Sequence, residues 1–127
     1  MSEPVLAREI FDRLRQATAN HPDTLIELCR EYLSEARNAL AQIGEALSHA
    51  DAGQVRERAH YLKGSSMMIG ARELSSACAR LEQMGRDSDL AAAAPELERA
   101  MAALKTVEAH LSQEVGANVL PDAGSAA

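Results

Sequence analysis

Apolar residues recur every three or four positions along most of the chain, which is the period of an α-helix with one buried face. The clearest run advances in steps of 4, 3, 4, 4, 3 and 4 residues through Leu25, Cys29, Tyr32, Ala36, Leu40, Ile43 and Leu47. A pattern of this length predicts one long helix over residues 22–50 that forms the seam of a helix bundle.

Two shorter helices should follow in close succession. Asp51, with Gln54 three residues later, is a candidate capping box for a helix that ends at Gly70, where a left-handed residue is favoured. The next helix covers residues 72–85. Because Gly70-Ala71 leaves so short a connection, we expect these two helices to be antiparallel neighbours.

The two ends of the chain are less regular. A first helix is expected over residues 4–18, with Ser2 as its cap and Pro4 in its first turn. The last helix should start between Leu90 and Pro95, since proline is tolerated only near a helix start. The composition after Gly116 is that of a mobile tail.

The expected fold class is therefore all-α: an antiparallel up-down four-helix bundle with an extra short N-terminal helix. Its 127 residues suit one domain, which we place at residues 1–115, with residues 116–127 as the flexible tail. Aromatic residues make up only 2% of the chain, while the helix-favouring residues Ala and Leu are abundant, so strands are not expected.

Charge and hydropathy exclude several classes of protein. A net charge of −6 is unfavourable for binding nucleic acid. No apolar run approaches 18 residues, and the N-terminus has no basic-then-apolar leader pattern. We therefore expect a cytoplasmic protein that neither spans a membrane nor binds nucleic acid.

The charge is unevenly distributed. Residues 56–86 contain six Lys or Arg residues and three Glu residues, so the segment around His60 is the basic part of an acidic chain. Such a segment favours a small anion or an acidic partner surface.

His60 has the surroundings that a phosphoryl acceptor needs. The apolar spacing of its helix predicts a buried stripe made of Val55, Ala59, Leu62, Ser66 and Ile69. His60 should lie at the edge of that stripe, on the same helix face as Arg56 and Lys63, and unprotonated imidazole is a nucleophile near neutral pH. Lys63 can compensate phosphoryl charge, Gly64 leaves space one turn from the ring, and Ser65 can add a hydrogen bond. No glycine-rich phosphate loop is present, so the phosphoryl group must come from another protein.

His60 has three other interpretations. Isolated helical histidines are mostly ordinary surface residues. A di-iron bundle needs Glu-x-x-His on two helices, and the chain has it once, at Glu57 and His60, so no metal site is expected. A sensor-kinase dimerisation helix would carry an acidic residue beside the histidine and a proline close behind it, but Tyr61 follows and the next proline is Pro95.

The run His60-Tyr61-Leu62-Lys63-Gly64-Ser65-Ser66, followed by Gly70, Leu74, Cys78, Leu81 and Gly85-Arg86, resembles the histidine-containing phosphotransfer (HPt) domain of multistep phosphorelays. The resemblance covers about residues 20–112. It implies a four-helix bundle in which His60 is phosphorylated, Lys63 assists through its charge and Gly64 gives access.

The resemblance also implies partners: receiver domains of response regulators and a hybrid histidine kinase. They would supply the aspartate and Mg²⁺, so the chain is expected to be a monomeric phosphocarrier without a cofactor of its own, not an enzyme. Docking in the family uses an exposed apolar patch, for which Met67, Met68 and Phe11 are candidates.

One position departs from the family pattern. Many members carry a glutamine on the next helix that orients the histidine, and here Glu82 stands at that position with Gln83 beside it. A carboxylate could accept a hydrogen bond from the ring but would repel a phosphoryl group. The alternative function is therefore a non-catalytic bundle that docks or sequesters a receiver domain.

Overall fold

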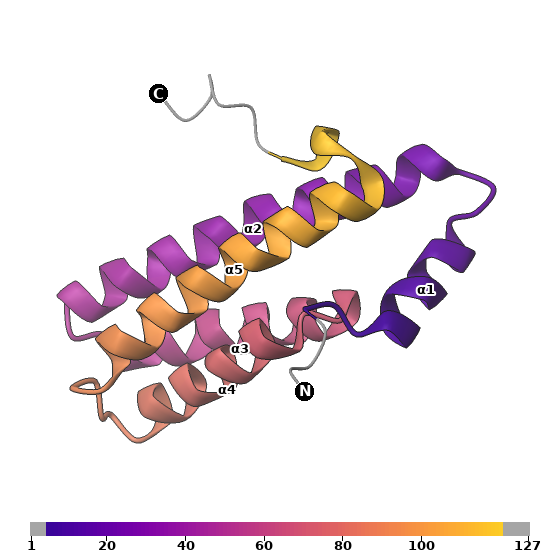
Figure 1. The fold of residues 1–127 in the computed structure, drawn as a ribbon. Coiled ribbons are helices and arrows are strands. Elements are labelled where there is room, and N and C mark those ends of the chain that lie inside the picture. Colours follow the sequence, from indigo (N-terminus) through magenta and orange to yellow (C-terminus); the bar gives the residue numbers. More distant parts are fainter. Residues whose placement is uncertain (1–4, 121–127) are drawn as a thin grey trace.

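The computed structural model describes residues 5–120, which form five α-helices and one short 3₁₀ helix. They are α1 (Arg8–Ala17), α2 (Pro22–Ser48), α3 (Ala52–Ile69), α4 (Arg72–Arg86), α5 (Ala93–Val115) and η1 (Ala117–Val119). From α2 to α5 the chain runs alternately up and down, with α2 beside α5 and α3 beside α4 (Figure 1). The predicted all-α antiparallel bundle with a short N-terminal helix is confirmed.

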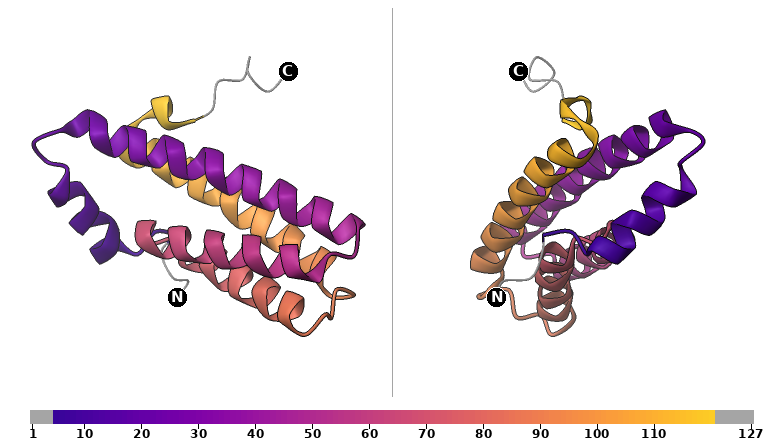
Figure 2. Two further views of the ribbon diagram at one scale, coloured as in Figure 1. Left: turned by 180° about the vertical axis from the view of Figure 1, so that it is seen from behind. Right: turned by 45° about the vertical axis from the view of Figure 1, so that its right-hand side comes forward.

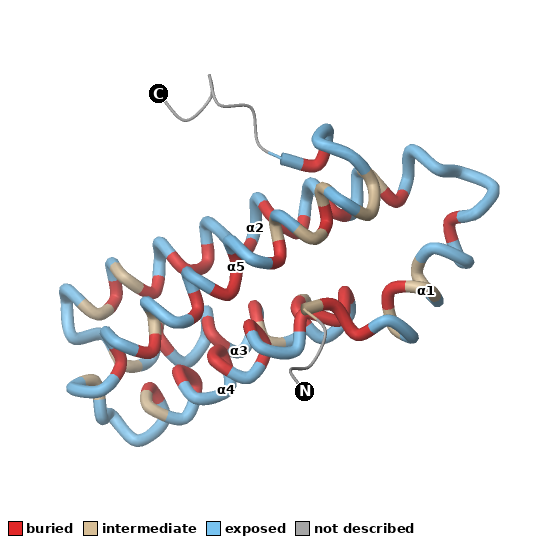
Figure 3. The backbone as a smooth tube through the Cα atoms, viewed as in Figure 1, coloured by how far each residue is buried: buried red, intermediate tan, exposed pale blue. Residues whose placement is uncertain are grey.

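The inward faces of the helices follow the apolar spacing of the sequence. The buried residues of α3 are the members of one stripe, Val55, Ala59, Leu62, Ser66 and Ile69. Buried positions line the inner side of every helix, and exposed positions lie on the outer sides (Figure 3). Burial of each large aliphatic side chain contributes roughly 1.5–3 kcal/mol, so this stripe holds α3 in the bundle.

One buried polar contact links α3 to α2. The hydroxyl groups of Tyr32 and Ser66 lie 2.7 Å apart, and both side chains are buried. Burial raises the pKa of the Tyr32 hydroxyl above its usual value. Because a buried hydroxyl is costly without a partner, the pair favours one register of the two helices.

The turns around α3 are fixed by local chemistry. The Asp51 carboxylate accepts a hydrogen bond from the Gln54 backbone N–H at 3.1 Å, but the Gln54 side chain donates to Glu57. Only the Asp51 half of the predicted capping box is thus formed. Gly70 ends the helix with a φ of +87°, the left-handed conformation that glycine adopts without strain.

The first helix starts later than its sequence predicts. Ser2 and Pro4 lie outside the described residues, and residues 5–7 are not helical. The Ala7 N–H donates instead to the carbonyl of Gly70 at 2.8 Å, so this segment is tied to the α3–α4 connection. From there α1 crosses the end of the bundle before the chain turns into α2 (Figure 2).

The structure describes part of the segment predicted as a flexible tail. Residues 117–119 form η1, which packs against α2 and α5 and buries the Val119 side chain. Burial of this valine explains why the chain folds back after Gly116. Residues 121–127 of the predicted tail lie outside the described part of the chain.

Both cysteines, Cys29 on α2 and Cys78 on α4, are free and buried. Burial raises the pKa of Cys29 to about 11 and that of Cys78 to about 12. No helix within residues 5–120 combines the length and the apolar character that crossing a membrane requires.

Two helical glycines have opposite surroundings. A Cβ atom at Gly85 would lie 2.7 Å from the backbone nitrogen of Arg56 and 2.8 Å from the carbonyl oxygen of Ala52, so only glycine lets α4 approach α3 this closely. A Cβ atom at Gly64 would meet nothing within 4 Å.

We therefore predict opposite effects of the same substitution. Gly85→Ala should lower the free energy of unfolding by about 1–3 kcal/mol because backbone must shift. Gly64→Ala should raise it by about 0.5–1 kcal/mol because alanine favours the helix. Urea titrations followed by circular dichroism would measure both, and a destabilising Gly64→Ala would contradict the open surroundings of that residue.

Candidate functional site

His60 lies in the middle of α3 and its ring is open to solvent. Its side chain is 68% exposed, although the neighbouring core residue Ala59 is fully buried. The ring is therefore reachable by another molecule, as the sequence predicted.

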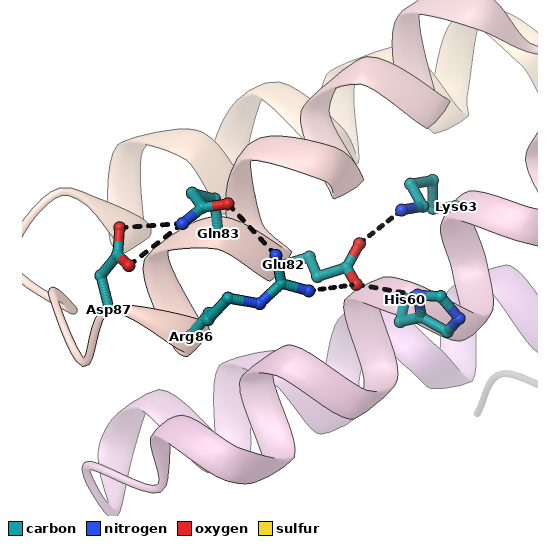
Figure 4. A network of polar contacts seen from close by, with 6 residues as sticks. All are labelled: His60, Lys63, Glu82, Gln83, Arg86 and Asp87. Atoms are coloured by element: carbon teal, nitrogen blue, oxygen red, sulfur yellow. Dashed lines mark hydrogen bonds and ion pairs between the residues drawn. The ribbon is translucent and has the colours of Figure 1, made fainter.

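One ring nitrogen is held by a carboxylate of the adjacent helix. Nδ1 of His60 lies 2.8 Å from Oε2 of Glu82 on α4 (Figure 4). An ionised carboxylate can only accept a hydrogen bond, so Nδ1 carries the proton and donates it. In a neutral ring this tautomer leaves the lone pair on Nε2, which is directed away from Glu82 in Figure 4.

Glu82 is kept ionised by cations around it. Lys63 donates to Oε1 at 2.6 Å, and Arg86 approaches Oε2 at 3.4 Å. The Lys63 hydrogen bond is the main cause that lowers the pKa of Glu82, and the His60 hydrogen bond adds to it, while burial opposes both. With a side chain only 8% exposed, Glu82 is a nearly buried anion with partners on three sides.

A groove opens on the other side of the ring. It has a volume of about 550 Å³, lies between α1, α2 and α3, and includes both His60 and Gly64 in its lining. Its exposed apolar members are Leu28, Tyr61 and Met68. The site thus combines a reachable nucleophilic nitrogen with an apolar surface next to it.

A family model described as the Hpt domain matches residues 27–115, which span most of α2 and all of α3, α4 and α5. This chain belongs to the Hpt domain family.

Solved structures agree with this assignment. Histidine-containing phosphotransfer protein B (HptB) from Pseudomonas aeruginosa PAO1 is 26% identical, with a TM-score of 0.81 over 89% of this chain and 96% of that one. Ypd1p is 16% identical and shares the fold, with a TM-score of 0.85 over 91% of this chain and 96% of that one. A search of curated proteins gives no significant match. The family and these likenesses support a histidine phosphotransfer role in phosphorelay signalling.

The Hpt domain brings together only some of the site residues predicted from the sequence. His60, Lys63 and Glu82 form one network, while Gln83 turns away from the ring and donates to Asp87 at 3.0 Å. Of the two alternatives on α4, Glu82 is therefore the residue at the histidine. Figure 4 shows both side chains from the same view.

The other supporting residues lie near the ring without contacting it through hydrogen bonds. Ser65 lines the groove and donates to the Leu62 carbonyl at 3.2 Å. Arg56 is exposed, and within residues 5–120 its side chain makes no hydrogen bond or ion pair that would fix it beside His60.

The docking candidates divide into exposed and buried residues. Met68 is 78% exposed and lines the groove of the Hpt domain, whereas Met67 is 58% exposed and faces a separate hollow beside Ile10 and Gly70. Phe11 is fully buried, so its prediction as a docking residue is wrong. Its ring is covered between Arg8 and Arg15, whose guanidinium carbons lie 5.9 and 5.4 Å from the ring centre.

Several residues at the site were not predicted from the sequence. Arg86, four residues after Glu82 on the same helix, could have been found from that spacing. On α2, Glu31 and Glu35 line the groove, and their repeat of four residues marks a polar face beside Leu28. Within residues 5–120, no group of three His, Cys, Asp or Glu side chains could hold a metal ion.

The lowered pKa of Glu82 predicts a pH-dependent stability. The ionised form stabilises the fold above its usual pKa of 4.5, and this contribution is lost as the pH falls through the lower folded value. Between about pH 5 and pH 3 the free energy of unfolding should therefore fall more steeply in the wild type than in Glu82→Gln.

Urea unfolding at a series of pH values would measure this difference. Glu73→Gln, which removes an exposed carboxylate from the same helix, is the matched control and should leave the wild-type slope nearly unchanged. Equal slopes for the wild type and Glu82→Gln would contradict a stabilising, ionised Glu82.

Proposed function

We propose that this Hpt domain is a phosphocarrier. His60 accepts a phosphoryl group from the aspartyl phosphate of one receiver domain and passes it to the aspartate of another. The observation that carries the proposal is the geometry of the ring: Nδ1 donates to Glu82 at 2.8 Å, and a side chain 68% exposed leaves Nε2 open.

The transfer step needs no proton to leave the ring. The Nε2 lone pair attacks phosphorus, a P–N bond forms, and the P–O bond to the partner's aspartate breaks and returns a carboxylate to the partner. The phosphorylated ring keeps its Nδ1 proton and carries a positive charge, which faces the Glu82 carboxylate at once. Passing the phosphoryl group to the next aspartate is the reverse of this step.

Two neighbours of His60, Lys63 and Gly64, assist the transfer in different ways. Lys63 neutralises Glu82 and places an ammonium group on the same side as the ring, which reduces repulsion of the incoming phosphoryl oxygens. Gly64 leaves open the space through which a partner loop reaches Nε2. The partner's receiver domain supplies the aspartate and the Mg²⁺, so the chain has no cofactor of its own and is not an enzyme by itself.

The partners we propose are those that the Hpt domain family implies. They are receiver domains, one in a hybrid histidine kinase and one in a response regulator, and the Hpt domain meets them as a cytoplasmic monomer that does not bind nucleic acid.

A second candidate function is docking without phosphorylation, because the carboxylate of Glu82 stands beside the acceptor ring. Two cations, Lys63 and Arg86, compensate that carboxylate, which favours the carrier. Complex formation with a phosphorylated receiver, without transfer of label, would identify the docking function instead.

The carrier function predicts a phosphohistidine. Incubation with a phosphorylated receiver domain and Mg²⁺ should give the wild type an acid-labile, base-stable label, since a P–N bond has that stability. His60→Gln should abolish the label, while His49→Gln, at another exposed histidine, should retain it. Label that persists in His60→Gln would place the phosphoryl group on another residue.

Access at position 64 gives a separate prediction. Gly64→Leu should fold, because nothing lies within 4 Å of the added Cβ, but its side chain should obstruct the partner. We expect transfer from the receiver to slow at least about tenfold, equivalent to about 1.4 kcal/mol in the barrier.

Two measurements distinguish obstruction of the partner from a loss of His60 reactivity. Phosphoramidate, a small phosphoryl donor, should still label His60 in Gly64→Leu. Ala102→Leu, which adds leucine at an exposed position of α5, should transfer at the wild-type rate. Wild-type transfer in Gly64→Leu would refute the access role of the glycine.

A further inference from the structure

The α2 wall of the groove carries two carboxylates that the phosphotransfer step does not use. Glu31 and Glu35 are exposed, lie one helical turn apart and line the groove together with His60. Glu35 accepts a hydrogen bond from the Tyr61 hydroxyl at 2.8 Å. Within residues 5–120 neither carboxylate forms an ion pair.

Stability of α2 does not account for this pair. Two like charges one turn apart oppose each other on a helix, and no cation stands three or four residues from either of them to offset their repulsion. The carboxylates therefore remain available to a group outside the chain.

The charge changes sign across His60. On the α4 side, Lys63 and Arg86 gather around Glu82, and on the α2 side Glu31 and Glu35 form the wall of the groove. Phosphoryl oxygens are attracted to the first side and repelled by the second. Any part of the partner that contacts the acidic wall must therefore be other than its phosphoryl group.

A partner that reaches Nε2 of His60 also covers the groove, because His60 and Gly64 are part of the groove lining. Its apolar side chains would contact Leu28 and Met68, which are 40% and 78% exposed. Covering this surface removes water from the carboxylates beside it. That is costly unless the partner brings a positive charge to the same place.

We propose that Glu31 and Glu35 determine which receiver domains this chain accepts. They select receivers that carry Lys or Arg next to the apolar part of their docking face, and they disfavour receivers with Asp or Glu there. This inference rests on the proposed phosphocarrier function and adds to it the charge pattern of the cognate partner.

The test measures transfer from two groups of purified receiver domains, one basic and one acidic beside the apolar docking residues. Glu31→Lys/Glu35→Lys should slow transfer from the basic group by about tenfold at low salt and speed it from the acidic group. Both effects should become smaller at high salt, because charges at the exposed edge of an interface are screened.

Controls separate selection from a general charge effect. Glu45→Lys/Glu98→Lys makes the same change in net charge at exposed positions outside the groove. It should change the rate of transfer from both groups of receivers slightly and equally. A Lys→Glu change in a slowed basic receiver should restore its transfer to Glu31→Lys/Glu35→Lys. Phosphoramidate should label His60 equally in all variants.

The outcomes distinguish the two proposals. If the wild type takes label from receivers but the groove and control variants behave alike, the selectivity of Glu31 and Glu35 is refuted and the phosphocarrier function stands. If the wild type takes no label from any receiver, both are refuted.

Discussion

The hydrogen-bonded carboxylate of Glu82 is the interaction on which the site depends. It joins α4 to two residues of α3, His60 and Lys63, and so connects the packing of these helices to the orientation of the ring. A nearly buried anion is tolerated only while its partners stay in place. The close approach that Gly85 allows between α3 and α4 brings the carboxylate within reach. Loss of the Glu82 carboxylate, or of the close approach at Gly85, would leave the His60 ring without its hydrogen-bond partner even if the bundle still folded.

The use of a carboxylate at this position has consequences of its own. An amide can rotate and offer either a donor or an acceptor, but an ionised carboxylate offers only acceptors. Glu82 therefore imposes one tautomer on His60 without help from other groups, and Lys63 and Arg86 supply the charge balance that an amide would not need. The basic character of residues 56–86 is in part this compensation within the protein, besides any attraction for an external anion.

The sequence could predict what depends on periodicity and could not predict what depends on how helices dock. The α3 stripe and the left-handed Gly70 followed from spacing and residue type, and both are present. Phe11 was misjudged because a periodic pattern identifies an apolar face but does not show whether another helix covers it. Glu82 and Gln83 are adjacent in sequence, and only the rotation of α4 decides which of them faces His60.

The two cysteines give the folded chain an internal reporter. Thiol reagents attack the thiolate, and Cys29 and Cys78, with pKa values near 11 and 12 inside the core, present almost none at neutral pH. Alkylation must therefore wait for opening of the surrounding helices. Since one thiol lies on α2 and the other on α4, pulse labelling and mass spectrometry could follow the opening of the two halves of the bundle separately, in the natural sequence.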